Sequence, residues 1–348
     1  MKPETRNPKQ ETRDLKKIIY IGNNLANMNP TPLIQLTLLL KASGFEVLVY
    51  SDKKNRFLRL LEMCFGIFKN TNANYILIDT YSTSNFYFAL ITSQLARLFS
   101  IKYMPILHGG NLVKRIRENP RLSKLIFKNA EINVSPSLYL QEEFQKKQFK
   151  TVFIPNAIEI KNYSFKKRSE FQPKLLWVRA FDKIYNPLMA VEVLILLKKK
   201  YPEARLCMVG ADKDGSLIEA KKMAKQQGVS DSIEFTGLLS KLDWINKSAE
   251  FDIFINTTNI DNMPVSVMEA MALGLPVVST NVGGLPYLIN HTKNGLLVAE
   301  NKVSEMAKAI ERLIENPEKA TEMTINAREM VSEFDMELAK IKWINLLN

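Results

Sequence analysis

Two carboxylates, Asp261 and Glu269, stand on either side of the start of one short, mostly apolar segment. Seven residues separate them, and a run of small and apolar residues follows. Two acids spaced in this way could hold the hydroxyl groups of a polyol from two sides. Taken alone, the pair is equally consistent with a solvated acid on a loop and a glutamate on a helix surface. The surrounding elements must decide between these interpretations.

The segment between and after the two acids has the signals of a short helix. Asn262 is a candidate cap, and Pro264 suits the first turn because it has no N–H group to leave unpaired. Gly274 ends the helix. The apolar run 251–257, which has the pattern of a buried strand, precedes this helix. We therefore expect the helix to start at the carboxyl edge of a sheet, where its free N–H groups can hold a diphosphate. One acid would then face a ribose and the other the group that the diphosphate carries.

Strand-like apolar runs alternate with helical patterns along the whole chain, which predicts parallel sheets covered on both faces. The pattern lapses around 157–173, a charged stretch without a regular period, and then restarts. We therefore predict an α/β protein with two facing Rossmann-like domains and a ligand-binding cleft between them. The strand-like runs are 18–22, 45–50, 75–80, 102–110, 132–136 and 152–156, and then 174–180, 205–210, 233–237, 251–257, 276–280 and 295–298.

The length of 348 residues fits two domains, and the charge is distributed in agreement with this. Residues 1–170 carry a net charge of +14 and residues 171–348 one of −2, which together give the +12 of the chain. The first half could therefore face an anionic surface or ligand. The predicted parts are a first domain at 1–160, a linker at 161–173, a second domain at 174–334, and a last helix at 335–348 that crosses back to the first domain.

Several function classes find no support. Two histidines exclude a histidine-rich metal site, and two distant cysteines in apolar contexts fit reduced thiols of a cytoplasmic protein. The polar N-terminus predicts a frayed tail and no secretory signal. No dinucleotide or P-loop glycine motif occurs. Asp212 and Asp214 imitate a metal-binding Asp-x-Asp motif, but their flanking glycines favour a turn before a helix.

The stretch 261–284 resembles the nucleotide-sugar site of retaining glycosyltransferases of the GT-B fold, family 4, the glycosyl transferases group 1. That family's pattern has two Glu separated by seven residues, then Ala-Met-Ala, Gly-x-Pro-Val-Val and a Gly-Gly loop. The resemblance covers most of residues 100–300 and is thinner in residues 1–100. The matching residues are Asp261, Glu269, Ala270 to Ala272, Gly274 to Val278, and Gly283 with Gly284.

The resemblance implies that the first domain, 1–160, binds the acceptor and that the second domain, 174–334, binds the nucleotide-sugar. It also implies a role for each matching side chain. Glu269 would bind the ribose hydroxyls of the donor, and Asp261 would contact the donor sugar or stabilise charge near its anomeric carbon. Arg179 and Lys183 would clamp the diphosphate. The reaction needs such cations because the departing nucleoside diphosphate gains negative charge as the glycosidic bond breaks. His108, at the end of a first-domain strand, would face the donor sugar. The further predicted binding residues are Gly22, Asn23, Gly109, Gly210, Gly237, Asn262, Met263, Val265 and Ser266.

This chain departs from the family pattern at several places. The first acid is Asp rather than Glu, and Asn262 replaces the usual Gly after it. The Gly-rich loop after the first strand is reduced to 22–24, and the spacing of Arg179 and Lys183 is one residue short. The sequence therefore does not name the donor sugar, the base or the acceptor.

The function that the resemblance implies is retaining transfer of a sugar from a nucleotide-diphospho-sugar to an acceptor hydroxyl, without an obligatory metal or cofactor. Surface polysaccharide or glycolipid synthesis is the expected setting. A phosphorylase or nucleotide-sugar epimerase of the same fold stays open, as does a non-catalytic sugar-binding protein. An epimerase would turn over the donor without any acceptor, and a non-catalytic protein would tolerate loss of Glu269.

Two basic stretches, 53–70 and 114–129, could rest on an anionic membrane surface, where a lipid-linked acceptor would be found. Each is equally consistent with an ordinary helix that has a solvated basic face. We expect a cytoplasmic protein that can lie peripherally on the inner face of the membrane. A nucleic-acid partner is not expected, because no basic motif with interleaved aromatic residues and no zinc site occurs.

Overall fold

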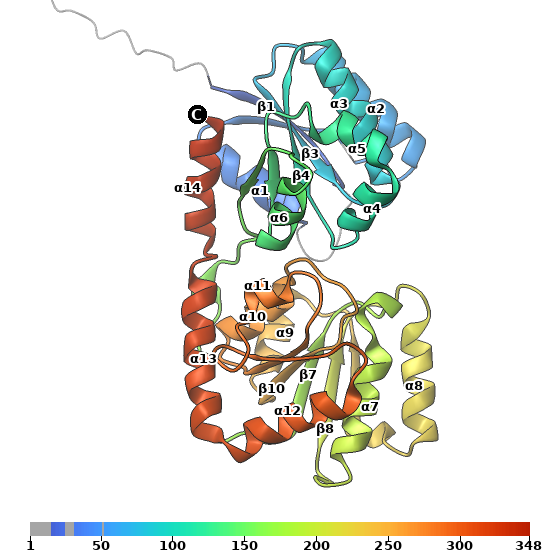
Figure 1. Cartoon of the computed structure of the whole chain (residues 1–348), viewed down its shortest axis with the longest axis vertical. Helices are drawn as coiled ribbons and strands as arrows, with labels where there is room; N and C mark the ends of the chain where they lie inside the picture. Colours follow the sequence, from blue (N-terminus) through green and yellow to red (C-terminus); the bar gives the residue numbers. More distant parts are fainter. Residues whose placement is uncertain (1–14, 25–30, 51) are drawn as a thin grey trace, which may run out of the picture.

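The computed structural model describes residues 15–24, 31–50 and 52–348. These form two domains, each built on a six-stranded parallel sheet (Figure 1). The strand orders are β2-β1-β3-β4-β5-β6 and β12-β11-β10-β7-β8-β9. The prediction of two Rossmann-like α/β domains is confirmed. The predicted tail at residues 1–14 lies outside the described residues.

The first sheet has helices on both faces because its strands are apolar on both sides. Helices α2 to α6 bury side chains against one face, and α1 packs on the other with α14 from the end of the chain. The elements are β1 (Lys17–Ile21), α1 (Pro32–Ala42), β2 (Glu46–Val49), α2 (Arg56–Lys69), β3 (Tyr75–Thr80), α3 (Asn85–Leu98), β4 (Lys102–Leu107), α4 (Leu112–Glu118), α5 (Pro120–Phe127), β5 (Asn133–Ser135), α6 (Leu138–Gln145) and β6 (Thr151–Phe153).

The second sheet repeats this arrangement. Its two faces carry separate apolar clusters, one under α7, α8 and α12 and one under α9, α10 and α11, and α13 contributes to both. The elements are β7 (Lys174–Val178), α7 (Pro187–Leu197), β8 (Arg205–Val209), α8 (Ser216–Gln226), β9 (Ile233–Gly237), α9 (Lys241–Ser248), β10 (Ile253–Asn256), α10 (Val265–Ala272), β11 (Val277–Thr280), α11 (Leu285–Leu288), β12 (Leu296–Val298), α12 (Val303–Glu315), α13 (Pro317–Ser332) and α14 (Met336–Leu347).

The chain passes between the domains twice. Residues 154–173 lead from β6 to β7 and contain one 3-10 turn, η1 (Ile160–Asn162). At the end of the chain, α13 lies on the second domain and α14 on the first, so the two helices run along one side of both domains (Figure 1). Trp343 and Leu347 of α14 are buried in the core of the first domain. The domain boundaries at 160 and 173 stay a prediction.

Candidate active site

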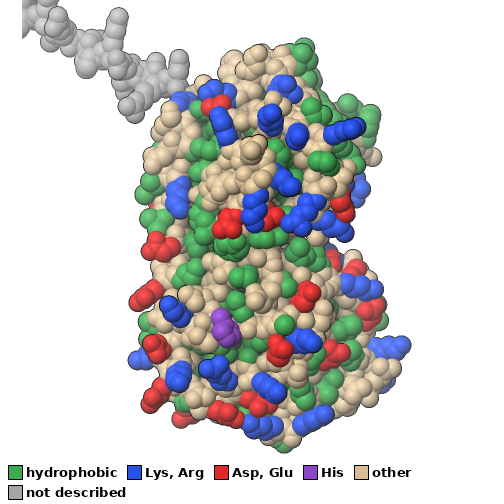
Figure 2. Space-filling view, viewed as in Figure 1, with side chains coloured by type: hydrophobic (Ala, Val, Ile, Leu, Met, Phe, Trp, Pro, Cys, Tyr) green, Lys and Arg blue, Asp and Glu red, His purple; other side chains and the backbone are tan. Residues whose placement is uncertain are grey.

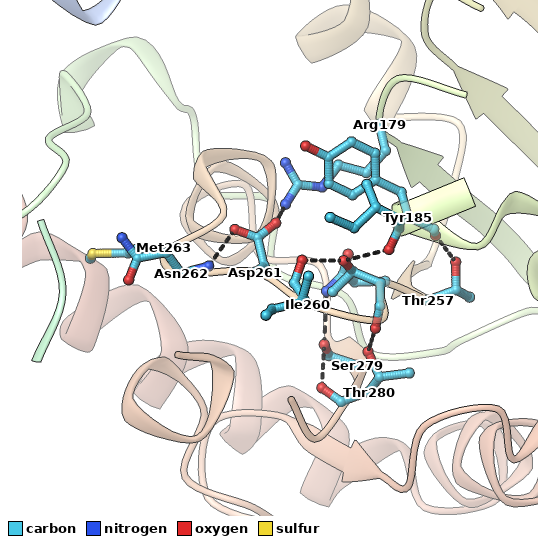
Figure 3. Close-up of polar contacts among 12 residues, drawn as sticks. Arg179, Tyr185, Thr257, Ile260, Asp261, Asn262, Met263, Ser279 and Thr280 are labelled. Atoms are coloured by element: carbon cyan, nitrogen blue, oxygen red, sulfur yellow. Dashed lines mark hydrogen bonds and ion pairs between the residues drawn. The ribbon is translucent and has the colours of Figure 1, made fainter. Parts of the chain in front are cut away.

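An ion pair joins two predicted site residues at the carboxyl edge of the second sheet. Arg179 directly follows β7, Asp261 lies in the loop after β10, and their side chains pair (Figure 3). The Arg179 guanidinium also lies over the ring of Tyr185, 4.5 Å from its centroid. Burial lowers the pKa of Arg179, although Tyr185 and Glu269 act in the opposite sense. The structure therefore places a buried guanidinium at this edge and pairs it with the carboxylate of Asp261.

Glu269 lies inside α10 and is almost fully buried. Its Oε1 accepts a hydrogen bond from the Tyr163 hydroxyl at 2.6 Å and pairs with Lys241 Nζ at 2.9 Å. Burial and the nearby Glu269 carboxylate raise the pKa of Tyr163. The acid is thus held in one orientation by two partners from other elements, which suits a group that must present its second oxygen to a ligand.

Sequence analysis missed both partners of Glu269. Lys241 is the first residue of α9 and comes shortly after the end of β9. A cation that follows a strand, the signal that indicated Arg179, was therefore present for Lys241 as well. Tyr163 gave no such signal, because it lies in the stretch assigned to the linker.

The start of α10 differs from the prediction in how it is capped. Pro264 takes the cap position, without any side-chain cap bond, and Val265 begins the helix. The predicted cap, Asn262, instead accepts a hydrogen bond from the Ser137 hydroxyl of the first domain. The prediction of Asn262 as the cap is wrong, because its side-chain oxygen is bonded to a residue of the other domain. Local sequence does not reveal such a partner.

Capping by Pro264 leaves donors at the start of α10 available. Within the described residues, the amides of Val265 and Ser266 have no hydrogen-bond acceptor, and the buried Ser266 hydroxyl has none either. The buried Nε of Arg179 is also without a hydrogen-bond partner there. Buried polar groups in folded proteins are normally paired. Unpaired donors at a helix N-terminus are the groups that a phosphate would satisfy.

His108 of the first domain is held by a cluster that the sequence did not reveal. Its Nε2 lies 2.9 Å from Asp79 Oδ1, and the Tyr20 hydroxyl donates to the same oxygen at 2.9 Å. Tyr81 stacks on the imidazole, with 4.6 Å between ring centroids. Burial, then Asp79, raises the pKa of Tyr20. Asp79 stands in the run YILIDT, and a carboxylate at the end of a strand was the available signal.

Two predicted glycines support this cluster. A Cβ on Gly22 would lie 2.3 Å from Asp79 Oδ2, so only glycine leaves room for the carboxylate. Gly109 has φ +79°, which lets the chain turn directly after His108. Next to it, a Cβ on Gly110 would lie 2.9 Å from Ile260 Cγ1, so the loop after His108 touches the loop that carries Asp261.

One cavity of about 380 Å³ joins the two halves of the site. Tyr20 and His108 line it from the first domain, and Lys241, Val265 and Glu269 line it from the second. Apolar side chains of α1 and α14 close its far side. The cavity is large enough to take a small polar ligand, and its two groups of functional residues come from different domains.

The other predicted residues have different surroundings. Lys183 lies at the surface, with its Nζ 3.5 Å from Glu219 Oε1, so the structure does not bring it to Arg179. Asn23 accepts a hydrogen bond from Arg59. Met263 packs its side chain into the apolar core of the second domain.

Gly210 and Gly237 end β8 and β9 beside the site. A Cβ on Gly210 would lie 1.8 Å from the Arg179 carbonyl oxygen, so this glycine permits the close approach of two strand ends. Its amide donates to the carbonyl of Gly237, whose φ is +72°. Both glycines therefore shape the edge on which Arg179 stands.

Asp212 and Asp214 form the predicted turn. Asp212 accepts from the amide of Gly215, and Asp214 accepts from the amides of Lys183 and Ser216. In the part of the chain that the structure describes, no group of three or more His, Cys, Asp or Glu could hold a metal ion.

Two facing Rossmann-like domains with a cleft between them are the architecture of GT-B proteins, and comparisons with known proteins agree. Residues 159–330, just under half of the chain, match the family model described as Glycosyl transferases group 1, so this part of the chain is similar to that family. The predicted resemblance thus holds for the second half, while the motifs upstream of residue 159 lie outside the match.

Curated relatives are similar over part of their length. An uncharacterized glycosyltransferase of Haemophilus influenzae is 28% identical over 60% of this chain and 57% of its own length. A GDP-mannose-dependent alpha-(1-6)-phosphatidylinositol monomannoside mannosyltransferase of Mycobacterium tuberculosis is 29% identical over 41% of this chain and 38% of its own. This chain therefore matches less than two thirds of each.

Solved structures share the whole fold. A sucrose-phosphate synthase from Thermosynechococcus elongatus superposes with a TM-score of 0.78 at 18% identity, over 95% of this chain and 98% of the other. HepE of Anabaena, in complex with UDP-glucose, gives a TM-score of 0.76 at 16% identity, over 95% and 99%. At these identities the likeness shows the GT-B fold.

Proposed function

We propose that this protein is a glycosyltransferase that moves a sugar from a nucleotide-diphospho-sugar to an acceptor hydroxyl. The observation that carries the proposal is the start of α10, where unpaired donors lie between Arg179 and the buried Glu269. The Glycosyl transferases group 1 domain and the HepE complex with UDP-glucose support it. Donor and acceptor would meet in the cavity between the domains.

Each part of the donor has a partner in this arrangement. The Val265 and Ser266 amides and the Arg179 guanidinium would bind the diphosphate, whose charge they complement. Glu269, held by Lys241 and Tyr163, would accept hydrogen bonds from the ribose hydroxyls. The sugar would then lie between Asp261 and the first domain.

We propose a retaining mechanism of family 4 without a metal ion. The bond between the anomeric carbon and the phosphate oxygen breaks, and its electron pair stays on the diphosphate, where Arg179 stabilises the new charge. The acceptor oxygen attacks the same face and passes its proton to the departing phosphate oxygen. His108 would bind a sugar hydroxyl, in the orientation that Asp79 fixes.

The acceptor is proposed to be a carbohydrate, carried on a lipid, in polysaccharide or glycolipid synthesis. Curated relatives with such names include the phosphatidylinositol monomannoside mannosyltransferase and an amylovoran biosynthesis glycosyltransferase of Erwinia amylovora, 26% identical over 204 residues. An anionic membrane surface is then the third partner, and the protein would work in the cytoplasm on its inner face. No helix in the described part of the chain is long and apolar enough to span a bilayer.

The decisive experiment measures thermal unfolding with a panel of nucleotide-sugars, with and without chelator, for the wild type, Glu269→Gln and the surface control Glu318→Gln. A ligand that binds only the folded protein raises its melting temperature. We expect a rise for one nucleotide family that Glu318→Gln keeps and Glu269→Gln loses. No rise with any nucleotide-sugar would overturn the proposal. A rise that chelator removes would overturn only metal independence.

Turnover assays separate the remaining alternatives. Release of nucleoside diphosphate that depends on an acceptor, with the anomeric configuration kept in the product by NMR, is the expected result. Conversion of the donor alone to its epimer would establish an epimerase. Release of a sugar phosphate from a glycan by inorganic phosphate would establish a phosphorylase.

A further inference from the structure

Helix α2 exposes a row of large apolar side chains that no part of the described chain covers. Five of its fourteen residues are Phe or Leu with half or more of their surface in solvent. Their spacing places them along one side of the helix, over a length of about 17 Å. We call this row the α2 stripe; its residues are Phe57, Leu58, Leu61, Phe65 and Phe68.

The α2 stripe is not a poorly packed core, because the opposite side of the helix is tightly held. Met63 and Ile67 are buried in the apolar cluster of the first domain. A Cβ on Gly66 would lie 2.4 Å from the Tyr50 ring, so the helix approaches that ring closely. Asn70 donates to the Tyr50 hydroxyl at 2.9 Å. The helix is anchored from one side and presents the stripe from the other.

The neighbouring helix extends the apolar surface. α3 packs beside α2, where Phe68 meets Phe99 edge-on with 6.0 Å between centroids. Ile91 and Leu98 of α3 are exposed, Leu98 by 74%. Figure 2 shows hydrophobic side chains gathered at the upper right of the first domain, where Figure 1 labels α2 and α3. A single exposed leucine needs no explanation, but a contiguous group of this kind marks an interaction site.

The charged residues at the ends of the α2 stripe indicate what kind of partner it binds. Exposed lysines and arginines stand at both ends of the helix: Lys53 and Lys54 just before it, Arg56 as its first residue and Lys69 as its last. The helix has one acid, Glu62, which is half-buried and accepts a hydrogen bond from the Asp52 amide. Just before the helix, Asp52 pairs with Lys53 Nζ at 2.8 Å, which leaves Lys54, Arg56 and Lys69 as the cations of this face. Apolar side chains flanked by cations suit a bilayer, where the cations meet anionic headgroups and the rings enter the acyl boundary.

We propose that the α2 stripe and its flanking cations are the face on which this protein binds an anionic bilayer. The helix lies in the plane of the interface, with its axis parallel to the surface. A second copy of the chain or a protein partner would need no cations at both ends of an apolar row, and these occupants are outcomes of the test.

The inner side of α2 connects this face to the cleft. Arg59 donates from Nη1 to Asn23 Oδ1 at 3.2 Å and from Nε to the Lys53 carbonyl at 2.7 Å. Asn23 follows β1 at the carboxyl edge of the first sheet, the edge that faces the second domain. If the proposed transfer to a lipid-linked acceptor holds, on which this step rests, the docked face brings the acceptor's headgroup beside loop 22–24.

The test is sedimentation with vesicles of half phosphatidylglycerol and half phosphatidylcholine, and with vesicles of phosphatidylcholine alone. We expect the wild type to bind the anionic vesicles at low salt and to release them at high salt. The variant Phe57→Ser/Phe65→Ser/Phe68→Ser should bind them at least about tenfold more weakly, because three rings no longer enter the interface. The matched control Ile218→Ser/Ile341→Ser removes exposed apolar residues elsewhere and should bind as the wild type does.

Two results would overturn this inference. One is that the triple variant binds the anionic vesicles as strongly as the wild type does, and the other is that the wild type does not bind the anionic vesicles at all. In the second case, light scattering that shows a dimer dispersed by the triple variant would assign the stripe to a second copy. Nucleotide-sugar binding by thermal shift should be the same in all three proteins. Vesicle binding without any nucleotide-sugar binding would overturn the proposed function and leave this face intact.

Discussion

At the scale of single residues, the shorter first acid has a structural consequence. Asp261 pairs with Arg179 and accepts a hydrogen bond from the Asn262 amide, so its carboxylate is held at the carboxyl edge of the second sheet. We therefore expect Arg179 to exchange this partner for the diphosphate when the donor binds, since a guanidinium binds both groups in the same way.

Asp79→Asn should lower kcat at least about tenfold while the KM for the donor changes little, because the groups proposed to bind the diphosphate and the ribose lie on the other domain. The asparagine keeps the shape, but it can present its NH2 group to His108 Nε2 and reverse the tautomer. Steady-state kinetics measure this, with Tyr20→Phe as the control that removes one donor to Asp79 and leaves His108 its acceptor. Equal losses in both variants would contradict a positioning role for Asp79.

Tyr163 makes stability depend on alkaline pH. Its folded-state pKa lies above the reference value of 10.0, so the unfolded chain releases the proton first. Stability is then fully present below about pH 10 and falls by about 1.4 kcal/mol per pH unit above it. Urea unfolding on both sides of pH 10 measures the free energy of unfolding of the wild type and of Tyr163→Phe. The advantage of the wild type over Tyr163→Phe should become smaller as the pH rises. Parallel curves for the two proteins would show that Tyr163 ionises freely in the folded state.

At the scale of elements, the strand ends determine where the cations stand. β7 and β8 approach so closely at Gly210 that no side chain fits there, and Arg179 emerges at that point. α10 then begins opposite, because Pro264 starts a helix without needing its own N–H. The site is therefore a property of how parallel strands end together.

Gly210→Ala should destabilise the protein by about 2–4 kcal/mol, since its Cβ would collide with the Arg179 carbonyl, and should abolish donor binding as well. Gly228→Ala is the matched control. Gly228 has φ +64° and open space around its Cβ position, so the change should cost only about 1–2 kcal/mol and leave donor binding intact. Urea titration and thermal shift with the donor measure both effects. Similar costs at the two positions would contradict the steric argument.

At the scale of the whole molecule, the two domains touch across the cleft as well as through the linker. Asn156 donates to the Met263 carbonyl at 3.2 Å, and the Tyr287 hydroxyl donates to Glu142 at 2.6 Å. The hydrogen bond to Glu142 raises the pKa of Tyr287 to about 12. These two hydrogen bonds hold the domains against each other in addition to the linker, so opening of the cleft would have to break them.

Tyr287→Phe removes one of these contacts and should shift the molecule toward an open form. The bond is partly exposed, so we expect less than about 1 kcal/mol, which still changes the open population several-fold. Small-angle X-ray scattering should show a larger radius of gyration for Tyr287→Phe than for the wild type and for the control Tyr201→Phe, which lies away from the cleft. A radius unchanged in both variants would show that this contact does not limit opening.

The sequence by itself determined the two Rossmann-like domains, because strand and helix periods are local and repeat along the chain. It also indicated the acids, the cation after β7 and the helix start, because strand ends and turn residues are local signals. Tertiary structure alone decided which side chains meet. Tyr163 reaches Glu269 across 106 positions, and Asn262 leaves its predicted cap for Ser137 across 125. Contacts over such separations depend on how whole domains pack, and no local pattern encodes them.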